Sequence, residues 1–308
     1  MKRILILGGN GFIGNHLINK LLANNHFVTA FGRTASGFEM NNPENFLFVK
    51  GDFEDVKQLN EILFKQDIVY HLISRTIPAN SWEKHEIEIS KNLSPTLHLI
   101  ELAIRNKVKK ICFASSGGTV YGINNKVNHE NSPTIPVTPH GIIKRTIESF
   151  LQNAKYSHNL DYDIYRISNV YGEGQNIKKG LGFINTAIEN IIKNRKVTVF
   201  GDGTNIRDFV YVSDVAELMS YSVQGNENKS NIYNISLGKS YSLNEVLEIM
   251  KSVLNIDFEI NYVSKRISDI PISRISNKKI IRKTKKAGLI PIDTGILNTY
   301  KYLLSKHL

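Results

Sequence analysis

The feature that most constrains this chain of 308 residues is its first fourteen residues. Residues 4–7 are Ile, Leu, Ile and Leu, an unbroken apolar run that is typical of a strand buried on both faces. A glycine-rich segment, residues 8–14, follows at once, and apolar residues at helical spacing continue to about residue 24. A buried strand, a glycine-rich turn and a helix N-terminus in this order predict a binding site for the phosphates of a dinucleotide.

The three glycines at regular spacing have different expected roles. Gly8 allows the tight turn, Gly11 lets the backbone approach a pyrophosphate, and Gly14 lets the helix pack on the strand. The spacing is G-x-x-G-x-x-G rather than G-x-G-x-x-G, and it resembles that of the extended short-chain dehydrogenase/reductase family, the NAD-dependent epimerase/dehydratase group. The other residues of this turn are then also expected to contact the cofactor: Asn10, Phe12 and Ile13.

Strands alternate with helices through the first half of the chain. Further strands are expected at residues 26–31, 46–49, 67–73 and 110–114, and a long helical stretch at about 82–106. This alternation predicts an α/β fold, a Rossmann-type doubly wound parallel sheet. We expect residues 1–172 to form the dinucleotide-binding domain, with the chain returning to it at about 207–235. Residues 173–308 would mostly form a smaller, discontinuous C-terminal substrate domain. Two helix starts are also expected: Ser213 as an N-cap, and Ser242 with Glu245 as a capping box.

Composition narrows the class of protein further. A single cysteine, Cys112, excludes an internal disulfide framework, and no Cys/His spacing for a metal occurs. The first apolar run is too short for a signal peptide or a membrane span, so a cytoplasmic protein without membrane insertion is expected. The formal net charge is +11, and basic residues crowd between 278 and 286. Because no nucleic-acid motif accompanies them, an anionic small substrate is the preferred explanation and nucleic acid is not an expected partner.

The end of the second predicted strand bears on the choice of cofactor. NAD enzymes place Asp or Glu there to hold the ribose hydroxyls. This chain has Phe31-Gly32-Arg33, and its next acid is Glu39. The planar guanidinium of Arg33 suits a 2′-phosphate, so NADP(H) is favoured and NAD(H) remains possible; a surface arginine is the alternative. The resemblance implies further cofactor contacts by Asp52 on the adenine, Phe53 and Leu72, and a buried helix asparagine at Asn92, for which a surface amide is the alternative.

Two segments resemble the active-site segments of the family. Residues 115–122 (SSGGTVYG) match the serine-rich strand end, and residues 138–148 (TPHGIIKRTIE) match the Tyr-x-x-x-Lys helix. In the family a phenol exchanges a proton with the substrate oxygen, a lysine lowers the phenol pKa and holds the nicotinamide ribose, and a hydroxyl bonds the same oxygen. The chain departs from this pattern twice, because His140 replaces the tyrosine and Gly117 replaces the serine.

An imidazole can take over the proton transfer. Its unperturbed pKa is about 6.5, against about 10 for tyrosine. Lys144 lies four residues later on the same helix face and would lower the pKa of His140 further. Ser116 or Thr119 would supply the missing hydroxyl. We hypothesise that His140 protonates the alkoxide that forms as hydride arrives; the alternative is a spectator histidine, with water or Tyr121 as the proton source.

Later motifs resemble the substrate-binding signatures of the sugar-nucleotide members. In the segment YRISNVYG, residues 165–172, the resemblance assigns Asn169 to the diphosphate of a nucleotide sugar. The strand around Phe200 would flank the base, Arg207 would clamp the diphosphate, and Arg266 is a second candidate for that contact. The resemblance therefore implies a nucleotide-diphosphate sugar as substrate, and also a homodimer through helices near 88–106 and 140–157.

Three functions are compatible with these motifs. Gly117-Gly118 stand where 4,6-dehydratases have Thr-Asp-Glu, which argues against elimination chemistry. Arg33 and the absent tyrosine favour reduction of a 4-keto group over oxidation of a hydroxyl. The preferred prediction is a reductase of a nucleotide-linked 4-keto-6-deoxyhexose, with dTDP-4-dehydro-6-deoxyglucose of bacterial O-antigen or capsule synthesis as best guess. The alternatives are a UDP-hexose 4-epimerase with bound NAD and a non-catalytic protein that binds sugar nucleotide or dinucleotide.

Overall fold

The computed structural model describes residues 1–35, 43–76, 82, 85–177, 182–224, 229–266 and 269–307. Glu39, the first acid after the second strand, lies outside these residues. None of the helices in the described part of the chain is long and apolar enough to cross a membrane.

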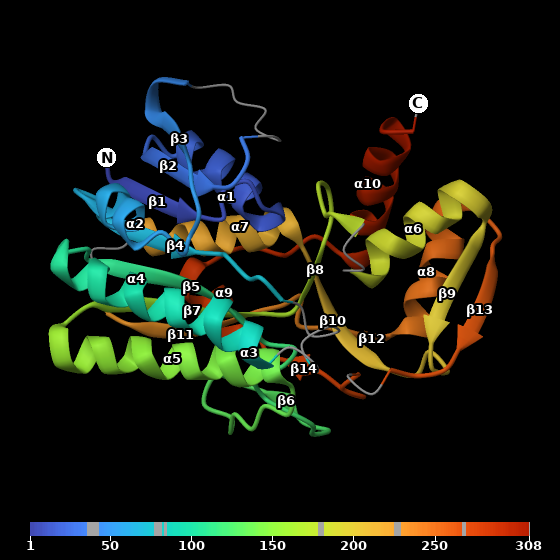
Figure 1. Ribbon diagram of the computed structural model, residues 1–308. Helices are drawn as coiled ribbons and strands as arrows, with labels where there is room; N and C mark the ends of the chain where they lie inside the picture. Colours follow the sequence, from blue (N-terminus) through green and yellow to red (C-terminus); the bar gives the residue numbers. More distant parts are fainter. Residues whose placement is uncertain are drawn as a thin grey trace.

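A seven-stranded sheet forms the centre of the molecule (Figure 1). Its order is β3-β2-β1-β4-β5-β7-β11, and every neighbouring pair is parallel. The predicted doubly wound α/β sheet is therefore confirmed. The strands are β1 (Arg3–Leu7), β2 (Phe27–Gly32), β3 (Phe46–Lys50), β4 (Ile68–His71), β5 (Lys110–Ser116), β7 (Asp161–Ile167) and β11 (Asn231–Ile235).

Helices cover both faces of this sheet, which explains the unbroken apolar run in β1. Ile4 and Ile6 point into one apolar cluster, and Leu5 and Leu7 point into the cluster on the opposite face. Alternate residues of a strand face opposite sides, so a strand covered on both sides is apolar throughout. One face is covered by α1 (Phe12–Ala23), α7 (Val212–Ser220) and α9 (Lys278–Thr284), and the other by α2 (Val56–Leu63), α4 (Ser94–Arg105) and α5 (Pro139–His158).

The expected helix at 82–106 is interrupted. Within the described residues it consists of α3 (His85–Glu88), a π-helical turn at Ile89–Leu93, labelled η3, and then α4. Pro95 lies in the first turn of α4. Because proline has no N–H to donate to the preceding turn, a regular α-helix cannot run unbroken through this point.

A second region is built around a third apolar cluster, on the right of Figure 1. Strand β10 (Ile206–Tyr211) pairs with β8 (Asn169–Tyr171) and β12 (Ser240–Ser242), and β9 (Lys196–Phe200) pairs with β13 (Glu259–Val263). The helices of this region are α6 (Phe183–Asn194), α8 (Leu243–Leu254) and α10 (Ile292–Ser305). A separate short pair is formed by β6 (Val127–Asn128) and β14 (Arg274–Ile275).

The chain crosses between the two regions more than once. Residues 206–211 join the three-stranded sheet rather than the central one, whereas α7 packs on α1 and β11 closes the central sheet. The return expected at 207–235 is therefore made by α7 and β11. The boundaries of the two domains stay a prediction.

Of the two expected helix starts, one is correct. Ser242 and Glu245 form a capping box, in which each side chain accepts a hydrogen bond from the backbone of the other. Ser213 is not a cap, because β10 runs directly into α7, whose first residue is already Val212. Its N-cap is Tyr211, without a side-chain capping bond.

Candidate active site

The glycine turn forms a close fit between β1 and α1. Gly8 has a φ of +85°, and its carbonyl accepts the N–H of Gly11 at 2.9 Å. A Cβ atom at Gly14 would lie 2.4 Å from the carbonyl oxygen of Gly8, so only glycine allows this approach. Gly11 caps α1, whose first turn holds no acidic side chain. The positive end of the helix and its unpaired N–H groups thus fit the pyrophosphate of a dinucleotide.

A small cavity of about 100 Å³ lies beyond this turn, at the end of β2. The Asn10 amide donates hydrogen bonds of 2.9 Å to both the carbonyl and the hydroxyl of Thr34, which ties the glycine turn to the residue after Arg33. Arg33 is exposed at the rim, and residues 32–35 contain no acid. The cavity is lined by Gly8, Asn10, Phe31, Gly32, Arg33, Gly51, Phe53, Ile73, Ser74 and Arg75.

The other predicted cofactor residues lie near this cavity in different settings. Phe53 is buried and its ring lies 5.0 Å from that of His71. The Asp52 carboxylate accepts a hydrogen bond from the Arg75 guanidinium at 2.7 Å. The backbone N–H of Glu54 and this guanidinium hold the pKa of Asp52 below its usual range. Leu72 is partly buried and packs on the apolar cluster under α1. The roles of Asp52, Phe53 and Leu72 toward a cofactor stay predictions.

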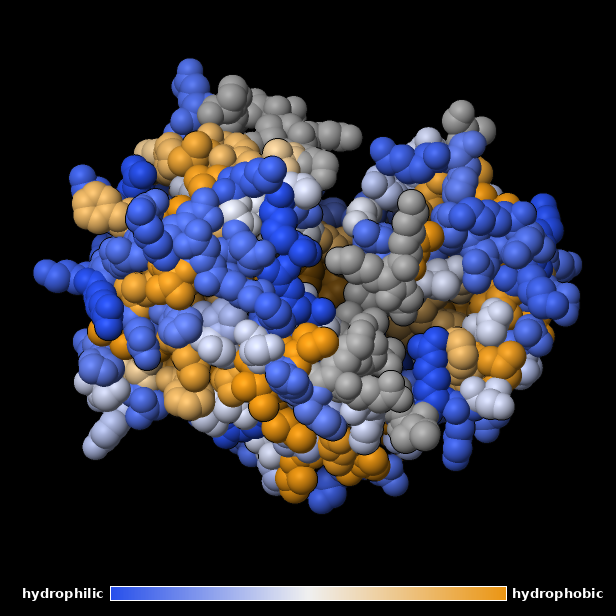
Figure 2. Space-filling model, in the orientation of Figure 1, coloured by the Kyte–Doolittle hydropathy of each residue, from blue (hydrophilic) through white to orange (hydrophobic). Residues whose placement is uncertain are grey.

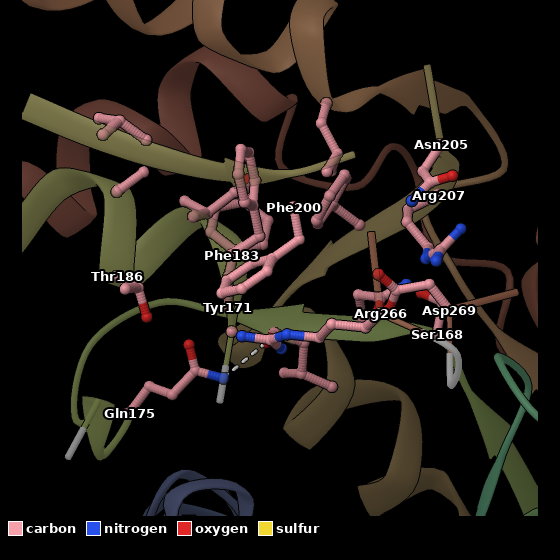
Figure 3. Close-up of a pocket in the computed structure, with 18 of the residues that line it drawn as sticks. Ser168, Tyr171, Gln175, Phe183, Thr186, Phe200, Asn205, Arg207, Arg266 and Asp269 are labelled. Carbon is pink, nitrogen blue, oxygen red and sulfur yellow. Dashed lines mark hydrogen bonds between the residues drawn. The ribbon is translucent and has the colours of Figure 1, made fainter. Parts of the chain in front are cut away.

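A larger cavity of about 480 Å³ opens between the central sheet and the second region, and the space-filling view shows a hollow there (Figures 2 and 3). Segments far apart in the sequence meet around it. The α1 N-terminus and the ends of β5 and α5 line one part, while β8, β9, β10 and the segment after β13 line the other. The predicted site residues that it brings together are Phe12, Ile13, Ser116, His140, Asn169, Phe200, Arg207 and Arg266.

Of the two candidate hydroxyls, that of Ser116 belongs to a residue that lines this cavity, as His140 does. Thr119 is buried and does not line the cavity. It lies under the first turn of α5, where the packing is close: a Cβ at Gly141 would lie 2.9 Å from the Thr119 carbonyl oxygen. Gly117, which we expect at the position of the family serine, is closely surrounded. A Cβ at Gly117 would lie 2.5 Å from the terminal methyl carbon of Ile275 and 3.0 Å from the Arg166 carbonyl oxygen, so a serine would require the Ile275 side chain to move.

His140 is the second residue of α5, whose start is fixed by the Thr138 hydroxyl accepting the Gly141 N–H at 3.1 Å. His140 is 7% exposed. Burial lowers its pKa from the ordinary value, with Lys144 adding to this effect and Glu88 opposing it. The lowered pKa keeps the ring neutral at pH 7, so it can accept a proton.

Lys144 lies behind His140 and is buried. Its ammonium donates to the Ala114 carbonyl at 2.8 Å and sits 4.7 Å from the centre of the Phe113 ring. Burial lowers the pKa of Lys144 to about 8, although the carboxylates of Glu88 and Glu148 favour its charged form. The lysine thus remains mostly a cation at pH 7, close to the end of β5.

Tyr121 is held away from the cavity. Its hydroxyl donates to the Asn234 side chain at 2.6 Å and accepts from Arg166 at 3.1 Å. Burial raises the pKa of this phenol. Because its hydroxyl is already hydrogen-bonded to Asn234 and Arg166, Tyr121 is disfavoured as the proton source.

Two of the diphosphate candidates, Arg207 and Arg266, also line this cavity (Figure 3). The Arg207 guanidinium donates to the carbonyls of Ile206 at 2.9 Å and Pro271 at 3.3 Å, and burial lowers its pKa while Asp269 opposes that effect. The Arg266 guanidinium lies 3.6 Å from the centre of the Phe200 ring. Two cations and an aromatic ring in one cavity suit an anion that carries a planar base.

One neighbour of His140 was not singled out from the sequence. Glu88 of α3 is buried, and its carboxylate faces the imidazole. Asn92, one helical turn later, is buried as well and hydrogen-bonds to Glu88, so the buried asparagine is correct and the surface amide is wrong. The one sequence signal for Glu88 is its position four residues before Asn92, on the same helix face. No cluster of His, Cys, Asp or Glu able to hold a metal ion occurs among the described residues.

The fold and the site together define a class, and comparison with known proteins agrees with it. Residues 4–236 match the model of the NAD dependent epimerase/dehydratase family. The chain belongs to this family.

Individual relatives include enzymes of different reactions. A protein of Methanocaldococcus jannaschii, provisionally named a UDP-glucose 4-epimerase, is 35% identical over 269 residues, 87% of each chain. The dTDP-4-dehydro-6-deoxyglucose reductase of Escherichia coli is 29% identical over 259 residues, 82% of each chain. The crystal structure of UDP-glucose 4-epimerase from Thermotoga maritima with UDP-glucose superposes with a TM-score of 0.91 at 30% identity, covering 99% of this chain and 100% of that one.

Proposed function

We propose that this protein is a 4-epimerase of a nucleotide-diphosphate hexose, with a UDP-hexose as the first candidate substrate and NAD as the resident cofactor. One observation carries the proposal: the buried imidazole of His140, whose pKa burial lowers from its ordinary value, and Ser116 line the same cavity. Named 4-epimerases among the relatives support it.

The residues present fit NAD, which would serve as a reversible hydride acceptor. The backbone of residues 8–14 would hold the pyrophosphate, and Lys144 would hold the nicotinamide ribose. His140 would accept the proton of the sugar 4-hydroxyl as that carbon is oxidised, and return it when the carbon is reduced from its other face. The Ser116 hydroxyl would hydrogen-bond the same oxygen.

This proposal departs from the reductase preferred from the sequence. That preference rests on Arg33 and on the expectation that loss of the tyrosine harms oxidation more than reduction. A neutral imidazole with a nearby carboxylate weighs the other way, because it is ready to accept a proton and would hold the resulting charge. A reductase needs a proton donor. His140 could donate only after its ring has been protonated, and its lowered pKa disfavours the protonated ring.

A specific observation keeps the reductase as a second candidate. Arg33 is exposed at the rim of the cavity at the end of β2, and no acid stands within residues 32–35 to hold a ribose hydroxyl. This arrangement favours NADP(H), a cofactor that a reductase consumes and an epimerase does not.

One pair of assays separates the two. The protein is incubated with NAD and UDP-glucose, and new anomeric signals are followed by proton NMR. In parallel it is mixed with NADPH or NADH and dTDP-4-dehydro-6-deoxyglucose, and loss of the reduced cofactor is followed by absorbance. The 4-epimerase predicts UDP-galactose in the first assay and no stoichiometric consumption in the second. Consumption in the second assay with no UDP-galactose in the first would replace it with the reductase, and silence in both would favour the non-catalytic binding protein.

The expected homodimer also stays a proposal. Large apolar side chains are exposed on the helices named for it, with Ile89 54%, Ile142 47% and Phe150 41% exposed. An apolar helix face of this kind suits a partner helix. Analytical ultracentrifugation of the wild type and of Phe150→Glu tests it: a dimer is expected for the first and a larger monomer fraction for the second.

A further inference from the structure

A buried carboxylate faces the imidazole that replaces the family tyrosine. Glu88 is 1% exposed, and its Oε1 lies 3.7 Å from Nδ1 of His140. Within the described residues this Oε1 is buried without a hydrogen-bond partner, whereas Oε2 accepts from the Asn92 amide at 2.8 Å. An unpaired buried carboxylate oxygen is costly, and the nearest ring N–H that can satisfy it is that of His140.

The Glu88 carboxylate is held in place from behind. The Asn92 Oδ1 accepts the backbone N–H of Arg75 at 2.8 Å, so its amide nitrogen must point the other way. That nitrogen donates to the Thr76 hydroxyl at 3.0 Å as well as to Glu88. Asn92 itself belongs to the π-helical turn η3 between Glu88 and α4, and such turns are frequent at functional sites. The loop after β4 thus fixes the side of His140 on which the carboxylate lies.

We propose that Glu88 is a positioning residue for His140: it takes the Nδ1 proton of the ring and thereby leaves Nε2 to act on the sugar hydroxyl in the cavity. This inference rests on the proposed function of His140 in proton transfer. When the ring accepts a proton at Nε2, the positive charge is shared with Nδ1–H and lies next to the carboxylate. Among the residues that the structure describes, the other titratable groups around this point are Lys144 and Glu148 of α5 and His71 of β4.

The same carboxylate would be unsuitable beside a tyrosine. A phenol must lose its proton to act as a base, and a neighbouring negative charge raises the pKa of a phenol. An imidazole becomes positive when it acts, so the same negative charge favours it. Glu88 and His140 are therefore a matched pair, because the carboxylate favours the positive charge that an imidazole acquires when it acts as a base.

A double-mutant cycle tests the pair. Glu88→Gln has the same shape and removes the charge. In the wild-type background we expect about a ten-fold lower turnover, the effect of about one pKa unit, with little change in KM. The acid limb of the pH profile should also move to lower pH, because the charge that raises the His140 pKa is gone. In the His140→Tyr background the same Glu88→Gln change should raise turnover or leave it unchanged. An equal loss in both backgrounds would show a merely structural Glu88 and overturn the proposal.

A second readout needs no substrate. Imidazole ¹⁵N NMR of the full chain, labelled at histidine and assigned with His140→Asn, reports the tautomer and titration of the ring. We expect the Nδ1–H tautomer in the wild type, and loss of that preference with a lower titration midpoint in Glu88→Gln. If these signals appear without turnover of UDP-glucose, the pair stands and the proposed function fails. If turnover appears and the ring signals do not respond to Glu88→Gln, the pair fails and the function stands.

Discussion

The two ends of the site differ in what shapes them. At the cofactor end the backbone makes the fit, since Gly8 and Gly14 are required by a positive φ and by a 2.4 Å approach. At the catalytic end side chains from separate elements make the fit, and here we expect Gly117 and His140 in place of the family serine and tyrosine. Only glycine satisfies the backbone geometry of the cofactor end, so the requirement can be recognised in the sequence as a glycine motif. Proton transfer can be satisfied by different groups, provided that their surroundings change as well.

The largest expected effect breaks the cofactor end. In Gly14→Ala the new methyl group meets the backbone oxygens of Gly8 at 2.4 Å and Gly9 at 2.7 Å, and neither can move aside. We expect roughly 10- to 100-fold weaker NAD binding, corresponding to about 1–3 kcal/mol of overpacking. Isothermal titration calorimetry measures it. Gly118→Ala is the matched control, since its Cβ would meet only the Ser116 hydroxyl at 4.0 Å; equal losses in both variants would contradict the account.

A smaller effect distinguishes the two hydroxyls of the catalytic end. Ser116→Ala should lower turnover about ten-fold, the value of one lost hydrogen bond to the reacting oxygen. Thr119→Val should have little effect, because its buried Oγ1 has no hydrogen-bond partner within the described residues and lies outside the cavity lining. Steady-state kinetics of both variants decides the assignment. The reverse order of the two losses would return the role to Thr119.

The smallest effect is a pH dependence. Burial lowers the pKa of Lys144 to about 8, so the cation behind His140 is lost as pH rises through that value. If the charge holds the cofactor ribose, kcat/KM should fall to about half near pH 8 and continue downward above it. Lys144→Arg should move this alkaline limb to higher pH, because arginine stays protonated. A flat profile from pH 7 to 10 in the wild type would exclude a role for the charge.

Much of this architecture could be predicted from the sequence because local rules determine it. The apolar strand run, the glycine spacing and the alternation of strands and helices reflect backbone and burial requirements within short segments. These requirements led to the correct sheet and to the capping box at Ser242. The start of α7 was predicted two residues late, since the strand β10 continues into the helix without a polar cap.

The catalytic neighbourhood was less accessible because it depends on contacts between distant segments. Glu88 lies 52 positions before His140, and the carboxylate meets the ring because α3 packs on α5. The choice between Ser116 and Thr119 depends on how α5 packs over the loop after β5. Likewise, the ion pair between Asp52 and Arg75 joins the segments that follow β3 and β4, and no local sequence pattern predicts such a pair.

We propose that the imidazole of His140 performs the proton transfer that a phenol performs elsewhere in the family. The most direct measurement is turnover of UDP-glucose by His140→Ala with saturating NAD, alongside calorimetry of NAD binding. General acid–base catalysis contributes about 10²- to 10⁴-fold, so a loss of that size with unchanged NAD affinity is the predicted result. Turnover equal to that of the wild type would contradict the account and leave His140 a spectator.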